Sequence, residues 1–312
     1  MLDSGQKNGG IISGFIKKKF NDYFSRQEPE GSDDHFVECN NLVKIYQAAD
    51  LEVFALQGLE LKIDKGEMVG IIGSSGSGKS TLMNILGGLD SPTAGQVKVG
   101  GWDLNDMSYR DKISYKREVV GFVWQNVGRN LVSYLTALEN VRLPMILGSN
   151  FRETEWAKEL LEAVGLEHRM DHRPAEMSGG QQQRVAIAIA LANKPDVLLA
   201  DEPTGSLDSK TGTEIFKVFK RVSERFNVTV IVVTHDRSLA GAVDRAIEIR
   251  DGKISTESVR KEKTSATEAK IGLKVTDEDQ DETHTKFTVV DSAGRLQIPE
   301  EYLEEMGIDE RA

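Results

Sequence analysis

The middle of the chain alternates short apolar runs with longer segments in which apolar residues recur at helical spacing. The apolar runs are rich in β-branched residues and are almost wholly free of polar side chains, which is typical of strands covered on both faces of a sheet. Three such runs stand out, at residues 68–72, 197–200 and 228–233. They predict buried strands.

Helical segments lie between and after these runs. In 153–164 and 215–226 the apolar residues fall on one helical face, and Gly165 provides a stop for the first segment. Strands that alternate with helices predict an α/β domain, which the pattern places at residues 35–255.

Composition divides the rest of the chain. Residues 1–34 are rich in Gly, Ser and charge, 256–283 are strongly charged and predict a flexible linker, and 284–312 predict a small module. The net charge of −11 argues against a nucleic-acid partner. The single cysteine, Cys39, cannot form an intrachain disulfide, and no apolar run approaches the roughly 20 residues of a membrane span. No signal peptide is recognised, so a cytoplasmic location is expected.

A phosphate-binding loop follows the first predicted strand. Residues 73–80 read G-S-S-G-S-G-K-S, and the apolar sequence after them opens a helix. Glycines without Cβ leave room for phosphates, backbone N–H groups surround the anion, Lys79 neutralises it and the Ser80 hydroxyl can ligate Mg²⁺. The predicted ATP-binding residues are Gly73, Ser74, Ser75, Gly76, Ser77, Gly78, Lys79, Ser80 and Thr81.

Two carboxylates end the second predicted strand. Asp201 can hold Mg²⁺ and Glu202 can polarise the water that attacks the γ-phosphate. Acids at a strand end also serve as solvated turn formers, but the upstream phosphate loop disfavours that reading here. His235 ends the third predicted strand, and in a parallel sheet it would lie beside these acids as a γ-phosphate contact.

A third motif, M-S-G-G-Q at 177–181, precedes an apolar helix. At this point the chain resembles an ABC ATPase, whose signature motif matches Ser178, Gly179, Gly180 and Gln181. The resemblance covers about residues 35–255 and implies a P-loop NTPase fold of ABC type, with a mixed-sheet core and a helical signature subdomain.

The resemblance also implies roles for individual residues. Tyr46 would stack on adenine, although it could be a half-buried strand tyrosine. Gln125 would contact Mg²⁺ and report to a membrane subunit, and Asp208 would belong to a loop that communicates across a dimer. Glu202 is then the general base, with Lys79, Gln125 and His235 as its catalytic partners. Mg²⁺ would be held by Ser80, Gln125 and Asp201, and two copies would enclose two ATP molecules.

Within the family, L-D-S-P-T-A-G at 89–95 and L-T-A-L-E-N-V-R-L-P at 135–144 are similar to the MacB/LolD/FtsE group. The group implies an export-type ATPase on the inner face of the cell membrane, beside a polytopic permease of MacB/FtsX-like type. The alternative is an FtsE-like ATPase that transmits force without moving a cargo. Residues 126–134, N-V-G-R-N-L-V-S-Y, depart from the group and leave the cargo open. A soluble ABC ATPase acting on DNA or ribosomes is disfavoured, because no second ATPase unit and no long coiled-coil insertion is found.

Both ends of the chain carry further patterns. Ile12, Ile16, Phe20 and Phe24 recur every four residues, which predicts an amphipathic helix within residues 11–26 that contacts a membrane surface or the permease, unless this end is simply a poorly ordered tail. The stretch 287–308 is similar to the first half of an AbrB/SpoVT-type swapped-hairpin domain. That similarity implies a dimerising or docking module, because the acidic balance opposes DNA binding.

Overall fold

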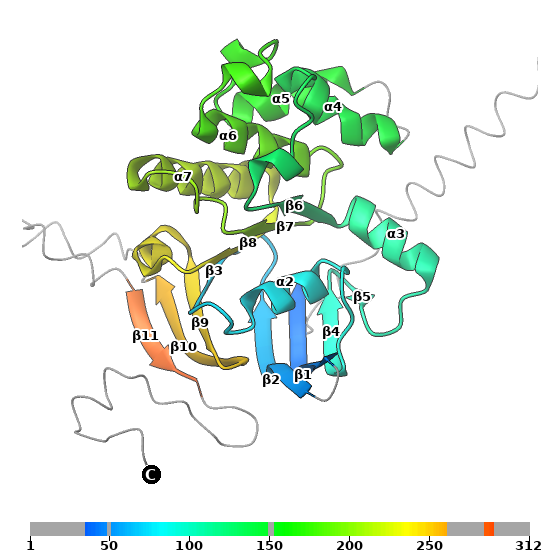
Figure 1. The fold of residues 1–312 in the computed structure, drawn as a ribbon, viewed down its shortest axis with the longest axis vertical. Helices are drawn as coiled ribbons and strands as arrows, with labels where there is room; N and C mark the ends of the chain where they lie inside the picture. The colour runs from blue at the N-terminus through cyan, green and yellow to red at the C-terminus, as the bar shows by residue number, and fades with distance from the viewer. Residues whose placement is uncertain (1–34, 49–50, 149–152, 261–283, 290–312) are drawn as a thin grey trace, which may run out of the picture. The chain divides into compact units, whose positions relative to one another are not determined.

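The computed structural model describes residues 35–48, 51–148, 153–260 and 284–289 (Figure 1). The chain divides into two units at Asp34, and every described residue belongs to the second unit. The predicted amphipathic helix at 11–26 lies outside the described residues.

A seven-stranded mixed sheet forms the centre of the second unit, in the order β11-β10-β9-β3-β8-β7-β6. Strands β9, β3, β8, β7 and β6 run parallel to one another, whereas β10 is antiparallel to both β9 and β11. The strands span Met68–Ile72 (β3), Val120–Val123 (β6), Val197–Asp201 (β7), Thr229–Thr234 (β8), Arg245–Arg250 (β9), Lys253–Arg260 (β10) and His284–Thr288 (β11). The three predicted strands are β3, β7 and β8, and the α/β fold with a mixed sheet is confirmed.

A second, four-stranded sheet is wholly antiparallel and has the order β2-β1-β4-β5. Its strands are Val37–Ala48 (β1), Leu51–Ile63 (β2), Ala94–Val99 (β4) and Trp102–Asp103 (β5). The register between β1 and β2 shifts at several bulges, so their side chains do not alternate strictly. This irregularity explains why the sequence pattern did not predict them.

Helices cover both faces of the central sheet (Figure 1). Alternate residues of β8 show this arrangement, since Val230 and Val232 pack in one apolar core and Ile231 and Val233 in the other. The first core contains α4 (Ala137–Leu147), α5 (Thr154–Ala163), α6 (Gly179–Ala190) and α7 (Ser209–Phe226); the second contains α2 (Lys79–Leu86), α3 (Tyr109–Glu118) and the four-stranded sheet. Short 3-10 helices span Val127–Arg129, Glu167–Arg169, Pro174–Glu176 and Arg237–Ala242.

The C-terminal strands differ from the sequence prediction. The prediction places a linker at 256–283, but residues 256–260 form the second half of β10, where they pair with both β9 and β11. Polar side chains there find partners within the sheet, for example the Thr256 hydroxyl, which donates to Glu248 at 3.1 Å. Strand β11 extends this sheet. The rest of the predicted C-terminal module, residues 290–312, lies outside the described residues.

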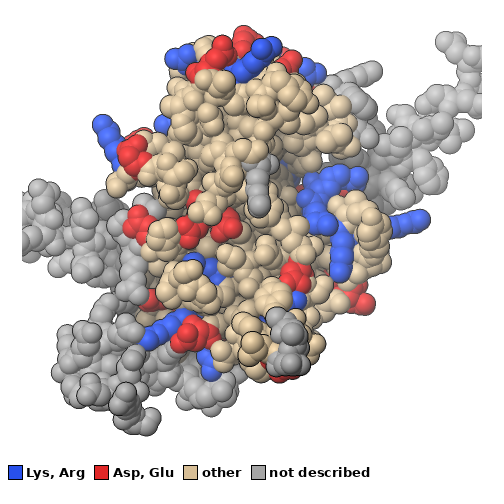
Figure 2. All heavy atoms as spheres, viewed as in Figure 1, with Lys and Arg blue, Asp and Glu red and all other residues tan. Residues whose placement is uncertain are grey.

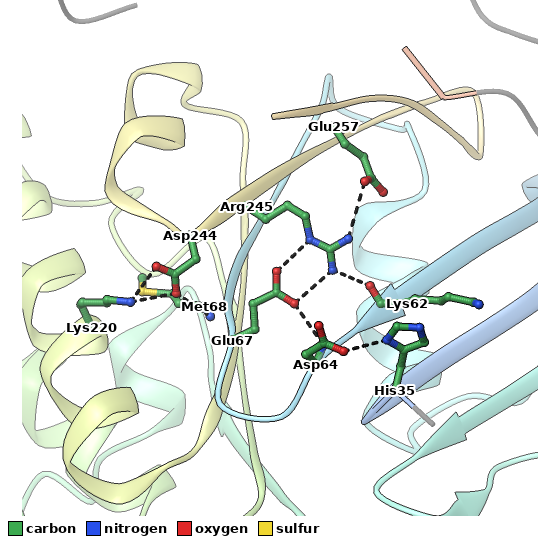
Figure 3. A network of polar contacts seen from close by, with 9 residues as sticks. All are labelled: His35, Lys62, Asp64, Glu67, Met68, Lys220, Asp244, Arg245 and Glu257. Carbon is green, nitrogen blue, oxygen red and sulfur yellow. Dashed lines mark hydrogen bonds and ion pairs between the residues drawn. The ribbon is translucent and has the colours of Figure 1, made fainter. Parts of the chain in front are cut away.

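A network of charged side chains joins β9 to its neighbours (Figure 3). The Arg245 guanidinium donates to both carboxylate oxygens of Glu67, at 2.8 and 3.1 Å, and to the carbonyl of Lys62. Glu257 of β10 approaches Arg245 at 3.6 Å. Arg245 and Glu67 are each only 17% exposed, so this pair is far less solvated than an ordinary surface ion pair.

Asp244 makes the adjoining connection (Figure 3). Its carboxylate accepts from Lys220 of α7 at 2.7 and 2.8 Å and from the backbone N–H of Met68 at 3.1 Å. Met68 begins β3, so these contacts hold the end of β3 that lies opposite the phosphate loop. Together the Glu67 and Asp244 carboxylates fix the position of the first residues of β3.

Candidate functional site

The loop between β3 and α2 has the conformation of an anion site. Gly78, the residue before α2, adopts a left-handed backbone with φ of 106°. The Lys79 side chain is 5% exposed, and its ammonium donates to the carbonyls of Gly73 and Ser74 at 2.8 and 2.6 Å. The cation is therefore held by the loop itself, within reach of any anion bound there.

Two glycines of this loop are required by the chain's own packing. A Cβ on Gly73 would lie 2.3 Å from the carbonyl oxygen of Ile249 in β9, and one on Gly78 would lie 2.5 Å from that of Ala55 in β2. The sequence argument explained the glycines by the room that phosphates need. At these two positions the close approach of neighbouring strands demands glycine as well.

The acids and the histidine meet at the ends of β7 and β8. These strands are parallel and adjacent, with Asp201 opposite Val233. The Glu202 carboxylate, 20% exposed, lies 2.6 Å from Nδ1 of His235, which is 64% exposed. Glu202 has a φ of 44°, a left-handed conformation that a non-glycine residue adopts only at a cost, and its N–H donates to the carbonyl of Val233 at 2.9 Å. The structure thus places His235 beside Glu202, where the parallel order of β7 and β8 was expected to bring it.

These groups surround one open hollow of about 420 Å³. Its lining comes from the phosphate loop, the start of α2, β2 and the ends of β7 and β8. The lining residues are Ala55, Ser75, Gly76, Gly78, Lys79, Ser80, Thr81, Glu202 and His235. Ala55 was not predicted, because its side chain carries no chemistry and only the path of β2 brings it there.

The electrostatics of the hollow suit a polyanion that arrives with a cation. Burial lowers the pKa of the Lys79 ammonium, although Glu202 and Asp201 oppose that change. Burial also raises the pKa of the Asp201 carboxyl, and the neighbouring Glu202 raises it further, while Lys79 acts in the opposite direction. An added divalent cation would relieve the crowding of the two carboxylates, and an added polyphosphate would complement Lys79.

The donor set fits Mg²⁺ together with phosphates. Hydroxyl, amide and carboxylate oxygens are the hard ligands that Mg²⁺ prefers, and Ser80, Gln125 and Asp201 supply them. In the described residues no group of three or more His, Cys, Asp or Glu side chains could hold a metal by itself. In nucleotide sites, phosphate oxygens commonly complete the coordination of Mg²⁺.

Gln125 follows β6 and lies near Glu202. A Cβ on Gly205 would stand 3.3 Å from Nε2 of Gln125 and 3.5 Å from Oε2 of Glu202, so both side chains flank this glycine. The fold thus places Gln125 at the same carboxyl-terminal ends of the parallel strands as Asp201 and Glu202.

The predicted signature residues begin α6. The Ser178 hydroxyl accepts from the N–H of Gln181 at 3.3 Å, and the Gln181 side chain accepts from the N–H of Ser178 at 3.0 Å, which forms a capping box. A Cβ on Gly180 would lie 2.6 Å from Thr211, whose N–H and hydroxyl donate to Asp208. Ser178 to Gln181 and Asp208 thus form one surface on α6 and α7, and none of them lines the hollow.

Positive charge on the face drawn in Figure 2 gathers over α3. Arg110, Lys116 and Arg117 of this helix are exposed. In the described part of the chain, no helix is long and apolar enough to cross a membrane.

Comparisons with known proteins agree on one family. The family model described as ABC transporter matches residues 56–205. An uncharacterized ABC transporter ATP-binding protein of Methanocaldococcus jannaschii, MJ1508, is 46% identical over 220 residues, which are 70% of this chain and 97% of that protein.

Solved structures give the same result. Two dimeric structures of the ATP-binding cassette MJ0796, one in a post-hydrolysis state with ADP and Pi, are 43% identical, with a TM-score of 0.62 over 71% of this chain and 97% of theirs. CbiO1 of Clostridium perfringens, part of the cbiONQ ABC transporter complex, is 28% identical, with a TM-score of 0.65 over 72% of this chain and 88% of its own.

Proposed function

Because the chain belongs to the ABC transporter family as an ATP-binding cassette that hydrolyses ATP, we propose that two copies close around two ATP molecules and drive a separate membrane permease. The observation that carries this proposal is the separation of two surfaces. One hollow holds Lys79, Glu202 and His235, whereas the helix start at Ser178 lies outside it.

A second copy would complete the site. The start of α6 presents backbone N–H groups and the positive end of a helix dipole, which suit the phosphates of an ATP bound to the partner. The dimeric state described for MJ0796, a structure 43% identical to this chain, supports this arrangement. ATP then drives closure to the extent that it binds the closed dimer more tightly than the open one.

The chain's own residues account for the chemical step. On binding, the Lys79 ammonium would exchange loop carbonyls for β- and γ-phosphate oxygens. Glu202 would accept a proton from the attacking water, and His235, 2.6 Å from Glu202, would hold both that carboxylate and the γ-phosphate. Mg²⁺, held by Ser80, Gln125 and Asp201 together with the phosphates, would neutralise the charge that develops on them.

The permease partner follows from the family resemblance. Similarity to the MacB/LolD/FtsE group favours an export-type system with a MacB/FtsX-like polytopic partner, and the cassette would sit on the cytoplasmic face of the membrane. An FtsE-like ATPase that transmits force without cargo is the second candidate. The membrane partner's extracytoplasmic domain would distinguish the two.

Glu202→Gln tests this proposal. The variant keeps the phosphate loop but loses the base, so hydrolysis should fall by about 10²-fold or more while ATP accumulates in a closed dimer. Size-exclusion chromatography with light scattering should show a dimer in ATP, and a detergent pull-down in ATP should recover a polytopic membrane protein.

Lys79→Ala is the matched control, because it should bind no ATP and should stay monomeric. A Glu202→Gln protein that remains monomeric in saturating ATP would contradict the shared site. Recovery of DNA or ribosomes in place of a membrane protein would contradict the permease.

A further inference from the structure

A charged network holds the side chain of Tyr46. The Tyr46 hydroxyl donates to Oδ2 of Asp90 at 2.8 Å, while Oδ1 accepts from the Lys44 ammonium and from the N–H of Ser91, both at 2.7 Å. Lys44 also donates to the carbonyl of Ser91 at 2.8 Å, and its side chain is 12% exposed. Charge-assisted bonds of this kind are stronger than neutral ones, so the phenol is tied firmly to the turn that follows α2.

The same lysine occupies one face of the ring. The Lys44 nitrogen lies 4.8 Å from the centroid of the Tyr46 ring, in the range of a cation–π contact. A flat ligand can therefore stack on the opposite face alone. Tyr46 is 38% exposed, which leaves surface for such a contact.

The ring stands beside the nucleotide hollow. Tyr46 is paired directly with Val53 of β2, and Ala55, two residues further along that strand, lines the hollow. The Thr81 side chain, which also lines it, lowers the pKa of the Tyr46 phenol, although burial and Asp90 raise that pKa overall.

The strand that carries Tyr46 is fixed to the same turn. Thr93 accepts from the N–H of Ile45 through its hydroxyl at 3.0 Å and donates its own N–H to the carbonyl of Val43 at 2.9 Å. The backbone on either side of Lys44 is thus held by the segment that contains Asp90. Backbone and side chain are positioned by one element.

We infer that Asp90 and Lys44 are positioning residues that hold Tyr46 as a one-sided platform for the purine base of ATP. This inference rests on the proposed role of Tyr46 as the base contact. Asp90 and Lys44 act through the tyrosine and touch neither phosphate nor water. Their loss should weaken binding of the base and leave the chemistry at Glu202 unchanged.

Steady-state ATPase kinetics of the purified full chain test this role, together with inhibition by inorganic tripolyphosphate, which has phosphates but no base. Asp90→Ala should raise KM for ATP by about tenfold, the effect of losing one hydrogen bond to a charged group. It should leave kcat and the tripolyphosphate inhibition constant within about twofold, since the phosphate loop is intact.

Tyr46→Phe is the milder second variant, because it removes only the hydroxyl and keeps the ring. It should raise KM for ATP without weakening tripolyphosphate inhibition. The KM of the Asp90→Ala/Tyr46→Phe double variant should be no higher than that of the worse single variant, because both changes remove the same hydrogen bond between Tyr46 and Asp90. Asp106→Asn, an exposed aspartate elsewhere, should behave as wild type.

Several outcomes would overturn the inference. An unchanged KM in Tyr46→Phe, additive effects in the double variant, or an equal loss of tripolyphosphate binding in Tyr46→Phe would each show that the network does not position the base. A different experiment tests the proposed function. If Glu202→Gln stayed monomeric in ATP, the proposed dimer would be contradicted, but the KM values of the Asp90 and Tyr46 variants would not change.

Discussion

Asp201 and Glu202 place two carboxylates beside a buried ammonium, and this crowding has a cost when no nucleotide is bound. Burial and Glu202 raise the pKa of Asp201, so the native state disfavours its charged form. The charged Asp201 side chain, which is suited to bind a cation, therefore destabilises the protein when no nucleotide is bound.

Asp201→Asn should accordingly stabilise the nucleotide-free chain at neutral pH, by about 1 kcal/mol. An acid whose pKa is raised in the native state contributes stability below its ordinary value of 3.8, and that stability is lost as pH rises through the native pKa. The advantage of the variant should thus shrink as pH falls toward that ordinary value. Thermal unfolding across pH measures it, and a variant no more stable than wild type at pH 7 would contradict the argument.

Some residues of the site could be predicted from the sequence, and others could not. Lys79, Glu202 and His235 carry the chemistry by residue type, and their spacing after predicted strands was enough to bring them together. The left-handed backbone of Glu202 and the contribution of Ala55 depend on the paths of β8 and β2, which no local pattern encodes. Asp90 lay in a segment noticed only for its family resemblance.

The strands of the central sheet differ in how fully they are buried, and this difference decided which of them could be predicted. Strands β3, β7 and β8 are covered on both faces and were predicted from apolar runs, whereas β9 and β10 carry several polar residues among their apolar ones. The Arg245–Glu67 pair connects this less apolar part of the sheet to the residue that precedes β3 (Figure 3). Its contribution to stability can be measured.

Arg245→Met should lower the free energy of unfolding by about 3 kcal/mol, because it leaves the shielded Glu67 carboxylate without its partner. Arg225→Met is the matched control, since Arg225 pairs with Glu159 at an exposed site and should cost less than about 1 kcal/mol. Denaturant unfolding compares them. Equal effects would mean that the Arg245 network adds nothing beyond a surface pair.

Over the whole molecule, the described chain adds β11 to the edge of a sheet that would otherwise end at β10. Strand β10 carries Val259, which is 38% exposed, and β11 pairs with it over five residues. An uncovered strand edge is a template for self-association. The covering strand therefore has a protective value apart from any role in the nucleotide site.

A chain that ends at Arg260 should keep ATP hydrolysis but should self-associate more than the full chain in the absence of nucleotide. Sedimentation velocity would detect the larger species. Val259→Lys in the shortened chain should restore the smaller one, because a charge on an edge strand opposes pairing. A shortened chain that sediments as the full chain does would contradict the protective role.

At this scale the cassette fold could be predicted from the sequence, but the edge of its central sheet could not. The fold class followed from motifs and apolar runs, because both depend on buried strands. The extent of β10 and the addition of β11 depend on pairing between segments that are far apart in sequence and polar in composition, which period and composition do not reveal.

The turn between β9 and β10 has a mechanical consequence. Gly252 in that turn donates to the carbonyl of Ser77 at 3.0 Å, so the phosphate loop rests on the hairpin from which the C-terminal residues continue. Tension applied to the chain beyond Thr288 would load β11 first, against its hydrogen bonds to β10, and only then β10 against its hydrogen bonds to β9. A tether attached at this end would thus pull on the nucleotide site only after the hairpin had sheared.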